Sequence, residues 1–194
     1  MRIINLILAL MFLLTTSTAA NELSPEVEEG VESIKQKKFD FSIESRVFSN
    51  DAAPEFMLKY KNLSLDWLHS NNHKNFLKLK VDKEIFSLMG TGLQWNVALN
   101  AVDTKKNSLA VLPSVGLNFY MRIRPRLDIY LQFSGFTLGR RAHTTDFESG
   151  FKYFPQKNLS ISAGWREINF KLRRGGNLND FHRHGLFAGI RYDF

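Results

Sequence analysis

The sequence predicts an all-β chain that folds into an antiparallel transmembrane β-barrel. Three observations predict this fold. From Phe39 onward apolar and polar residues alternate with a period of two, which is typical of strands with one apolar and one polar face. Several of these segments run for about 10 to 13 residues, the length of a tilted strand that crosses a bilayer. Residues 124–126 and 155–158 read as tight turns and 173–184 as a long polar loop, and such an asymmetry is typical of outer-membrane barrels.

The composition is that of an ordinary globular chain of 194 residues, with 44% hydrophobic and 23% charged residues. The absence of cysteine excludes a lipoprotein anchor, a disulfide framework and any cysteine-based metal or nucleophile site. The formal net charge of +7 is clearly basic. In an exported protein, such a charge points to anionic lipid or polysaccharide at least as readily as to nucleic acid, for which no motif is present.

Residues 1–20 read as a secretory signal peptide. Arg2 precedes an apolar run from Leu6 to Leu14, and small residues at Thr18 and Ala20 form a cleavage site. The apolar run has about nine residues where a membrane-spanning helix needs about 20. Removal of the peptide takes away a single charged residue, Arg2, so the formal net charge falls from +7 to +6.

Residues 21–38 are predicted to form a short amphipathic helix on the periplasmic side. Ser24 is a suitable N-cap and Pro25 suits the first helical position. Glutamates come first and lysines last, which matches the helix dipole, and Val27, Val31 and Ile34 form a narrow apolar stripe. The alternative is a loosely ordered leader.

The barrel domain is expected to span residues 39–194. Eight alternating segments are preferred, at 56–68, 75–86, 92–101, 109–122, 127–138, 143–154, 159–172 and 184–194. Residues 39–48 also alternate, and the apolar face breaks near Lys61 and Asn62, where a bulge or a turn would account for it. A turn there, together with the extra strand, gives ten strands as the alternative. Eight is preferred because two strands of six or seven residues would be short for a bilayer.

The last segment, GLFAGIRYDF at 185–194, carries apolar side chains on one face up to its final residue. It resembles the C-terminal strand of Gram-negative outer-membrane β-barrel proteins, which has a terminal aromatic residue, an aromatic residue two positions earlier and apolar residues at alternate positions before that. The resemblance implies that Ile190, Tyr192 and Phe194 are a recognition signal for the barrel-assembly machinery. The strand would then pair with the first strand and leave no edge unpaired in lipid.

Residues 146–170, DFESGFKYFPQKNLSISAGWREINF, together with 185–194, are similar to a group of small Gram-negative outer-membrane barrel proteins without an assigned activity. This resemblance implies an uncharacterised eight- to ten-stranded barrel, monomeric and located in the cell outer membrane. It implies a fold and not a mechanism.

A periplasmic end for the last strand assigns a side to every connection. All five histidines, His69, His73, His143, His182 and His184, then fall at or near the extracellular connections. The basic residues predicted to contact lipopolysaccharide phosphates there are Lys105, Lys106, Arg140, Arg141, Arg173, Arg174 and Arg183. The alternative is a solvated loop surface. No metal is predicted, and His182 and His184, alternate residues on one strand, are the pair that a metal site would use.

Some outer-membrane barrels are enzymes, so residues that could form a catalytic triad are relevant here. Ser149, His143 and Glu148 contain the residue types of a hydrolase triad. On a regular strand, however, His143 and Ser149 share the outward face and Glu148 points inward. No catalytic residue and no cofactor is therefore predicted.

The inward faces carry both signs of charge, at Gln94, Asn96, Asn118, Arg122, Asp128, Tyr130, Gln132, Asp146, Glu148, Lys152, Arg166, Arg191 and Asp193. In an eight-stranded barrel such side chains fill the interior, so opposite charges should pair and close the lumen. Ten strands would loosen this conclusion. The expected function is structural or surface-interacting, and the alternatives are a lipid-A-modifying enzyme and a narrow channel for small solutes.

Overall fold

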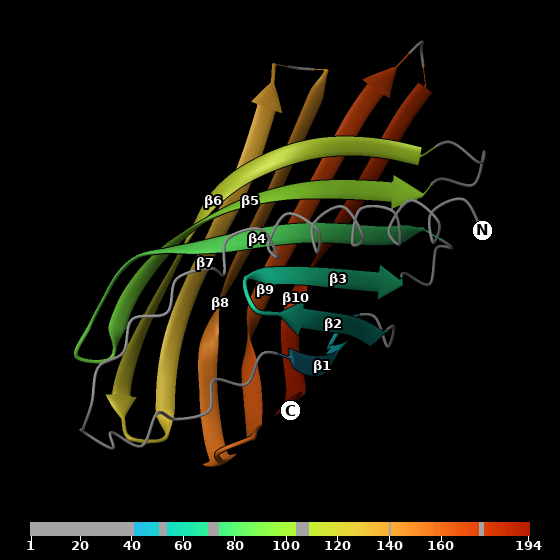
Figure 1. Ribbon diagram of the computed structural model, residues 1–194. Helices are drawn as coiled ribbons and strands as arrows, with labels where there is room; N and C mark the ends of the chain where they lie inside the picture. Colours follow the sequence, from blue (N-terminus) through green and yellow to red (C-terminus); the bar gives the residue numbers. More distant parts are fainter. Residues whose placement is uncertain (1–40, 51–53, 70–73, 104–108, 140, 175–176) are drawn as a thin grey trace, which may run out of the picture. The chain divides into compact units, whose positions relative to one another are not determined.

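The computed structural model describes residues 41–50, 54–69, 74–103, 109–139, 141–174 and 177–194 (Figure 1). These residues form a closed barrel of ten antiparallel strands, in which each strand pairs with its neighbours in sequence and β1 pairs with β10. The predicted signal peptide at 1–20 and the predicted helix at 21–38 lie outside the described residues. The predicted all-β barrel is confirmed.

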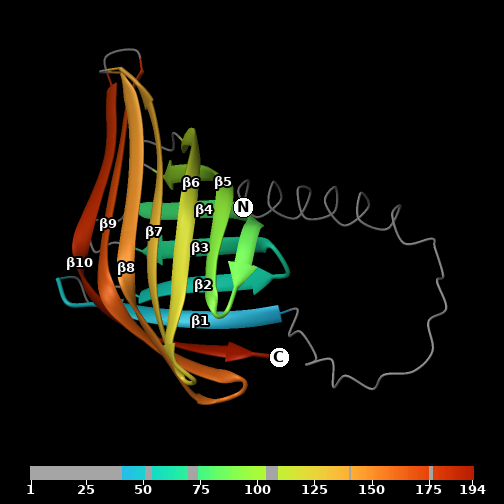
Figure 2. The ribbon, with the colours of Figure 1, turned by 90° about the vertical axis from the view of Figure 1, so that its left-hand side faces the viewer.

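The first three strands have seven or eight residues, and the other seven have 12 to 17. Their bounds are β1 Phe41–Phe48, β2 Pro54–Tyr60, β3 Leu63–His69, β4 Asn75–Leu88, β5 Thr91–Asp103, β6 Leu109–Arg124, β7 Leu127–Leu138, β8 Ala142–Gln156, β9 Leu159–Arg174 and β10 Asn177–Asp193. In Figure 1 the strands β2–β5 run across the direction of β7–β10, and in Figure 2 β2 and β3 do so too, as expected of a strongly twisted barrel wall.

The preferred count of eight strands is wrong and the alternative of ten is confirmed. Lys61 and Asn62 form a turn between β2 and β3 rather than a bulge, and Lys61 adopts a positive φ of 51°. The segment left over from the count of eight is β1, which pairs with β10 on one side and with β2 on the other. Strands of seven residues are compatible with this wall because β2 and β3 both continue the ladder between β1 and the longer β4.

We expect Lys61→Gly to raise the free energy of unfolding by about 1 kcal/mol, because glycine adopts a positive φ without the steric cost that a Cβ incurs. Chemical unfolding of the refolded barrel, followed by tryptophan fluorescence, measures the change. In the middle of one long strand the same substitution would be destabilising by about 0.5 to 1 kcal/mol. A loss of stability would therefore contradict the turn.

The barrel has two different ends. At the turn end, four two-residue turns at 61–62, 89–90, 125–126 and 157–158 join the strands, and β1 begins and β10 ends. The other connections lie at the opposite end, the loop end. The long polar loop predicted at 173–184 is wrong, because β9 continues to Arg174 and β10 already begins at Asn177.

Side chains are distributed inside out. Among the described residues, twenty polar or charged residues are buried but only twelve hydrophobic ones, and every strand exposes large apolar side chains outward. Strand β1 shows the pattern fully, with buried and exposed residues in strict alternation. In the described part of the chain no helix is long and apolar enough to cross a membrane, a finding that does not concern crossing by strands.

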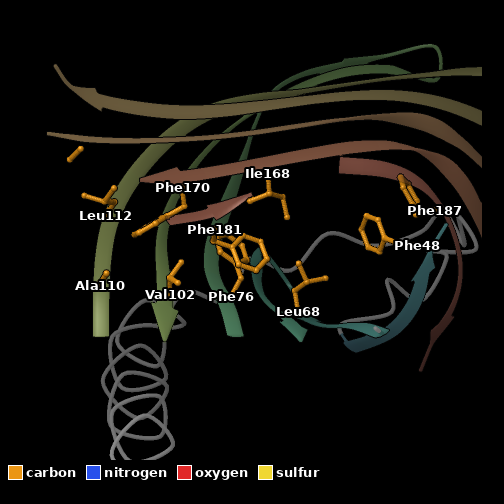
Figure 3. Close-up of a cluster of buried hydrophobic side chains, with 11 residues drawn as sticks. Phe48, Leu68, Phe76, Val102, Ala110, Leu112, Ile168, Phe170, Phe181 and Phe187 are labelled. Carbon is orange, nitrogen blue, oxygen red and sulfur yellow. The ribbon is translucent and has the colours of Figure 1, made fainter. Parts of the chain in front are cut away.

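The buried apolar residues gather inside the barrel towards the loop end. The loop-end cluster contains Phe48, Leu68, Phe76, Val102, Ala110, Leu112, Ala142, Ile168, Phe170, Phe181 and Phe187 (Figure 3). Phe76 and Phe181 stack with ring centroids 5.3 Å apart, so that β4 contacts β10 across the interior. The core is thus confined to one end of the barrel and leaves the rest of the interior to polar side chains.

Candidate functional site

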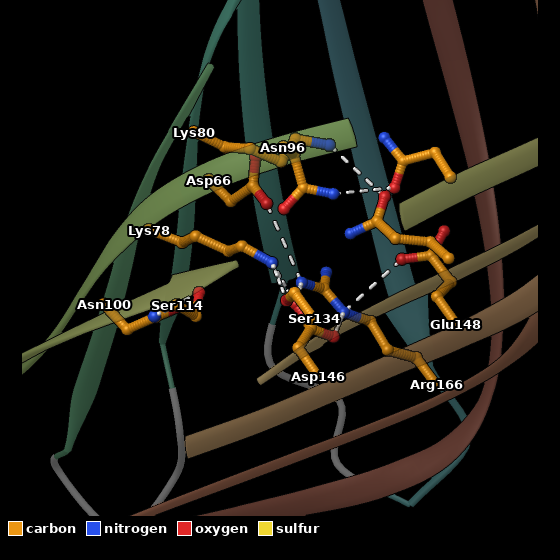
Figure 4. A network of polar contacts seen from close by, with 12 residues as sticks. Asp66, Lys78, Lys80, Asn96, Asn100, Ser114, Ser134, Asp146, Glu148 and Arg166 are labelled. Atoms are coloured by element: carbon orange, nitrogen blue, oxygen red, sulfur yellow. Dashed lines mark hydrogen bonds and ion pairs between the residues drawn. The ribbon is translucent and has the colours of Figure 1, made fainter. Parts of the chain in front are cut away.

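A network of buried charges fills the middle of the barrel, centred on Arg166 of β9 (Figure 4). Arg166 is 1% exposed and donates two hydrogen bonds to Asp146, from Nε to Oδ1 at 2.9 Å and from Nη2 to Oδ2 at 2.8 Å. It also donates to Glu55 of β2 and lies 3.4 Å from Glu148 of β8. This bidentate geometry fixes the guanidinium plane, which a single charge contact would not do.

Two further cations extend the network across the interior. Arg46 of β1 donates from Nε to Glu44 at 2.8 Å and from Nη1 to Glu148 at 2.9 Å. Lys78 of β4 is fully buried and donates to Asp146 at 2.7 Å and to Ser134 at 3.1 Å. The expected pairing of opposite charges inside the barrel is confirmed for these groups, which join β1, β2, β4, β7, β8 and β9.

A pocket of about 300 Å³, the turn-end pocket, lies between this network and the turn end. Its polar lining includes nine residues of the inward faces identified from the sequence, namely Gln94, Asn118, Asp128, Tyr130, Gln132, Glu148, Lys152, Arg191 and Asp193. It also includes Lys59 and Ser64, which the sequence analysis missed. The missed signal was the turn at Lys61, because a two-residue turn pairs Lys59 with Ser64 across the β2 and β3 hairpin.

Four basic residues form an outer basic patch at the loop end, namely Arg141, His143, Lys171 and Arg173. His143 pairs in register with Lys171, and the backbone N–H of Arg173 donates to the carbonyl of Arg141 at 2.8 Å. Ala142 and Phe170, which alternate with them, are buried in the interior, so the patch faces outward. The structure thereby brings together Arg141 and Arg173, two of the predicted lipopolysaccharide contacts, as exposed neighbours.

Arg183 does not fit a surface contact with lipopolysaccharide. It points into the barrel, is 6% exposed, and its guanidinium lies 4.1 Å from the ring centroid of Phe48. Its Nη1 donates to the carbonyl of His69 at 3.3 Å. Arg183 therefore ties β10 to the end of β3, and its buried side chain does not form the predicted contact with lipopolysaccharide. Lys105, Lys106 and Arg140 lie outside the described residues, as does the side chain of Arg174.

Four of the five histidines lie in the loop-end halves of strands, as predicted, and His73 lies outside the described residues. The His182 and His184 rings are neighbours on the outer face of β10, with centroids 5.0 Å apart. His182 Nε2 lies 3.6 Å from a carboxylate oxygen of Glu167. Among the described residues, no group of three or more His, Cys, Asp or Glu side chains is arranged to hold a metal ion.

The triad candidates are divided between the two faces of β8, as the spacing predicts. Glu148 is buried and accepts hydrogen bonds from Arg46 at 2.9 Å and from Tyr130 at 2.9 Å. Ser149 and His143 alternate with these inward positions and belong to the outer face. The three side chains therefore cannot act on one substrate atom.

The predicted assembly signal lies on the outer face at the turn end. Ile190, Tyr192 and Phe194 are all exposed, and the rings of Tyr192 and Phe194 meet edge to face at 4.9 Å. The backbone N–H of Phe194 donates to the carbonyl of Phe41 at 2.9 Å, which extends the ladder between β1 and β10.

Comparison with known proteins adds no relative, since no family model, no curated protein and no solved structure matches the chain. A functional assignment therefore rests on the geometry and chemistry of the residues themselves.

Proposed function

We propose that the chain is an integral outer-membrane β-barrel, monomeric, with a closed and charged lumen and a structural or surface-interacting role. The observation that carries the proposal is the inside-out distribution of side chains. Large apolar residues on all ten strands face outward, while Arg166, Lys78 and Asp146 are buried. In water such a surface would be a severe aggregation hazard, whereas in lipid it is the favourable solution.

The closed backbone ladder supports the same proposal. Every strand pairs with a neighbour on both sides, so the described barrel wall has no unpaired edge strand. A bilayer tolerates spanning strands only where their backbone polar groups are satisfied in this way. Export by a cleaved signal peptide and recognition of the last strand by the assembly machinery belong to the same proposal.

Two layers support a closed lumen. The network around Arg166 joins six strands through charged hydrogen bonds, and the loop-end cluster lies beyond it as a layer of packed apolar side chains. A hydrated ion would have to break ion pairs of the network around Arg166. It would then have to lose its hydration water to cross the apolar loop-end cluster. A narrow channel is therefore the less favoured use of this interior.

The three tryptophans test the membrane proposal directly, because Trp67, Trp95 and Trp165 all lie on the outer face. In vesicles containing brominated lipids we expect strong quenching of tryptophan fluorescence, since bromine atoms in the acyl chains quench on contact. Soluble iodide should quench weakly in the same samples. The opposite pattern, strong quenching by iodide and none by brominated lipid, would contradict membrane embedding.

The outer basic patch supports lipopolysaccharide as the surface partner. Arginine binds phosphate through two parallel hydrogen bonds, and Arg141 and Arg173 are placed side by side at the loop end of β8 and β9, on the outer face. We expect the double variant Arg141→Ala/Arg173→Ala to retain clearly less lipopolysaccharide on purification in mild detergent, measured as bound phosphate. Lys157→Ala, which removes an exposed cation at the turn end, is the matched control. Equal retention by all three proteins would count against the patch.

A further inference from the structure

The turn-end pocket has an uneven pairing of charges. Each carboxylate in its lining lies within 4.0 Å of a cation: Glu44 and Glu148 of Arg46, Asp82 of Lys80, Asp128 of Arg122, and Asp193 of Arg191. Lys59 and Lys152, which also line the pocket, have no hydrogen bond or ion pair with any described residue. The Lys152 ammonium lies over the Tyr130 ring, 5.9 Å from its centroid. Glu44 attracts Lys152 from a distance but is bound by Arg46, so both lysines remain without an ion pair among the described residues.

The surroundings of Lys59 are dominated by like charge. Arg191, Lys80 and Lys152 repel its ammonium group, and Asp82 attracts it. Asp82 is already bound by Lys80 at 3.4 Å and by the amide of Asn118 at 2.8 Å. The carboxylates around Arg166 lie deeper in the barrel, and Asp128 and Asp193 near the turn end are bound by Arg122 and Arg191, so each described carboxylate of the lining near Lys59 already has a cation. An anion placed there would relieve the repulsion.

A buried hydroxyl lies between two of these lysines. Ser64 pairs in register with Lys59 on one side and with Lys80 on the other, so the three side chains share the inward face. Ser64 lines the pocket, is 2% exposed, and its Oγ has no hydrogen-bond partner among the described residues. Burying a hydroxyl without a hydrogen-bond partner is costly. The Ser64 hydroxyl can therefore donate a hydrogen bond to a ligand oxygen.

From this arrangement we propose that the turn-end pocket binds the phosphate group of a small solute. Lys59, Lys80 and the Ser64 hydroxyl donate to the phosphate oxygens, and Lys152 and Arg191 supply positive charge from the other strands that line the pocket. Compact ammonium groups suit a multiply charged phosphate, to which they bind as point charges. The volume of about 300 Å³ limits the solute to a small molecule.

The remainder of the pocket fits a hydroxylated solute. Gln94 and Gln132 place amide groups in the lining beside the ring of Tyr130. Because Gln132 accepts from Lys80 through Oε1 at 3.2 Å, its NH₂ group remains available as a donor. Glycerol 3-phosphate combines a phosphate with hydroxyl groups at a size that this volume accommodates, and it is the probe of choice.

The experiment is calorimetric titration of the full chain in an uncharged detergent at low ionic strength, with inorganic phosphate, glycerol 3-phosphate and glycerol. We expect the two phosphates to bind and glycerol not to bind. Lys59→Met and Ser64→Ala should each weaken binding by about tenfold, the loss expected for one charge-assisted hydrogen bond. Lys157→Met, which removes an exposed cation at the same end, should bind like the wild type.

Folding of the variants is monitored in the same samples. Phosphate should raise the unfolding temperature of the wild type and of Lys157→Met, and that of Ser64→Ala by less, while a cooperative unfolding transition of Ser64→Ala without phosphate shows that the variant is folded. If phosphate on a phosphatidic acid headgroup in nanodiscs binds while the free solutes do not, the phosphate group is recognised on a lipid. Absence of binding by every phosphate, or equal binding by Lys59→Met, Ser64→Ala and wild type, overturns the proposal.

Discussion

Replacement of Arg166 by methionine is expected to lower the free energy of unfolding by about 3 to 5 kcal/mol. The substitution keeps most of the side-chain volume but removes the cation that binds Asp146, Glu55 and Glu148. Asp146 keeps its ion pair with Lys78 and Glu148 keeps that with Arg46, but three buried carboxylates then share two cations and no water replaces the lost charge, which is costly. Guanidinium unfolding of the protein in lipid vesicles, followed by tryptophan fluorescence, measures the loss.

The control for this prediction is Arg122→Met. Arg122 binds Asp128 at 3.0 Å, but its side chain is 53% exposed, so water replaces much of the lost interaction. Arg122→Met should lower the free energy of unfolding by no more than about 1 kcal/mol. Glu55→Gln in the Arg166→Met background should recover part of the stability, because it neutralises one of the stranded carboxylates. Equal losses for Arg166→Met and Arg122→Met would contradict a tightly buried network.

The wild type and Arg166→Met also test whether the lumen is closed. In planar bilayers the wild type is expected to give no steady single-channel steps. Arg166→Met should also remain silent wherever it is folded, because the loop-end cluster lies beyond the network as a second barrier. Steady steps from the wild type would overturn the closed lumen and favour a channel.

The second large effect is expected at Gly164 of β9. A Cβ at this position would lie against the carbonyl oxygen of Ser149 and 2.8 Å from the Cα of Gly150, both on the neighbouring strand β8. These are backbone atoms of a paired strand, which cannot move aside without breaking the ladder. We therefore expect Gly164→Val to destabilise the barrel by about 3 kcal/mol.

Ala163→Val is the matched control on the same strand, because Ala163 alternates with Gly164 and belongs to the outer face. It adds the same kind of side chain without a backbone clash, so stability should change by about 0.5 kcal/mol or less. Unfolding midpoints of both variants, measured side by side in vesicles, give the comparison. A Gly164→Val protein as stable as Ala163→Val would show that β8 and β9 are less closely paired than the structure has them.

The side on which Arg183 lies depends both on the alternation along the last strand and on where that strand begins. Alternation predicts that odd-numbered residues of the last strand face inward, as Arg191 and Asp193 do. Arg183 follows the same rule, but a strand that begins at 184 leaves it in a surface loop, whereas β10 begins at Asn177 and includes it. Polar residues such as Asn177 and Asn179 resemble a loop, yet pairing with β9 keeps them in the ladder. Long-range pairing here overrides local composition.

The sequence by itself determined the strands β4 to β9 and the face of most of their residues, because alternation is a property of neighbours along the chain, whereas it placed the start of β10 seven residues too late. A break in alternation at Lys61 did not distinguish a bulge from a turn, since both shift the apolar face by one residue. Only pairing of β1 with both β2 and β10 decided for ten strands.

The tertiary structure alone decided which charges meet. Arg166 and Glu55 are 111 residues apart in sequence and bind each other across the barrel. The pocket likewise brings Lys59 and Lys152 into one cavity from distant strands. Strand patterns fix the side of the wall on which a residue lies, whereas the height at which it faces another strand depends on the register around the closed barrel. That register is a global property, which no local stretch of sequence contains.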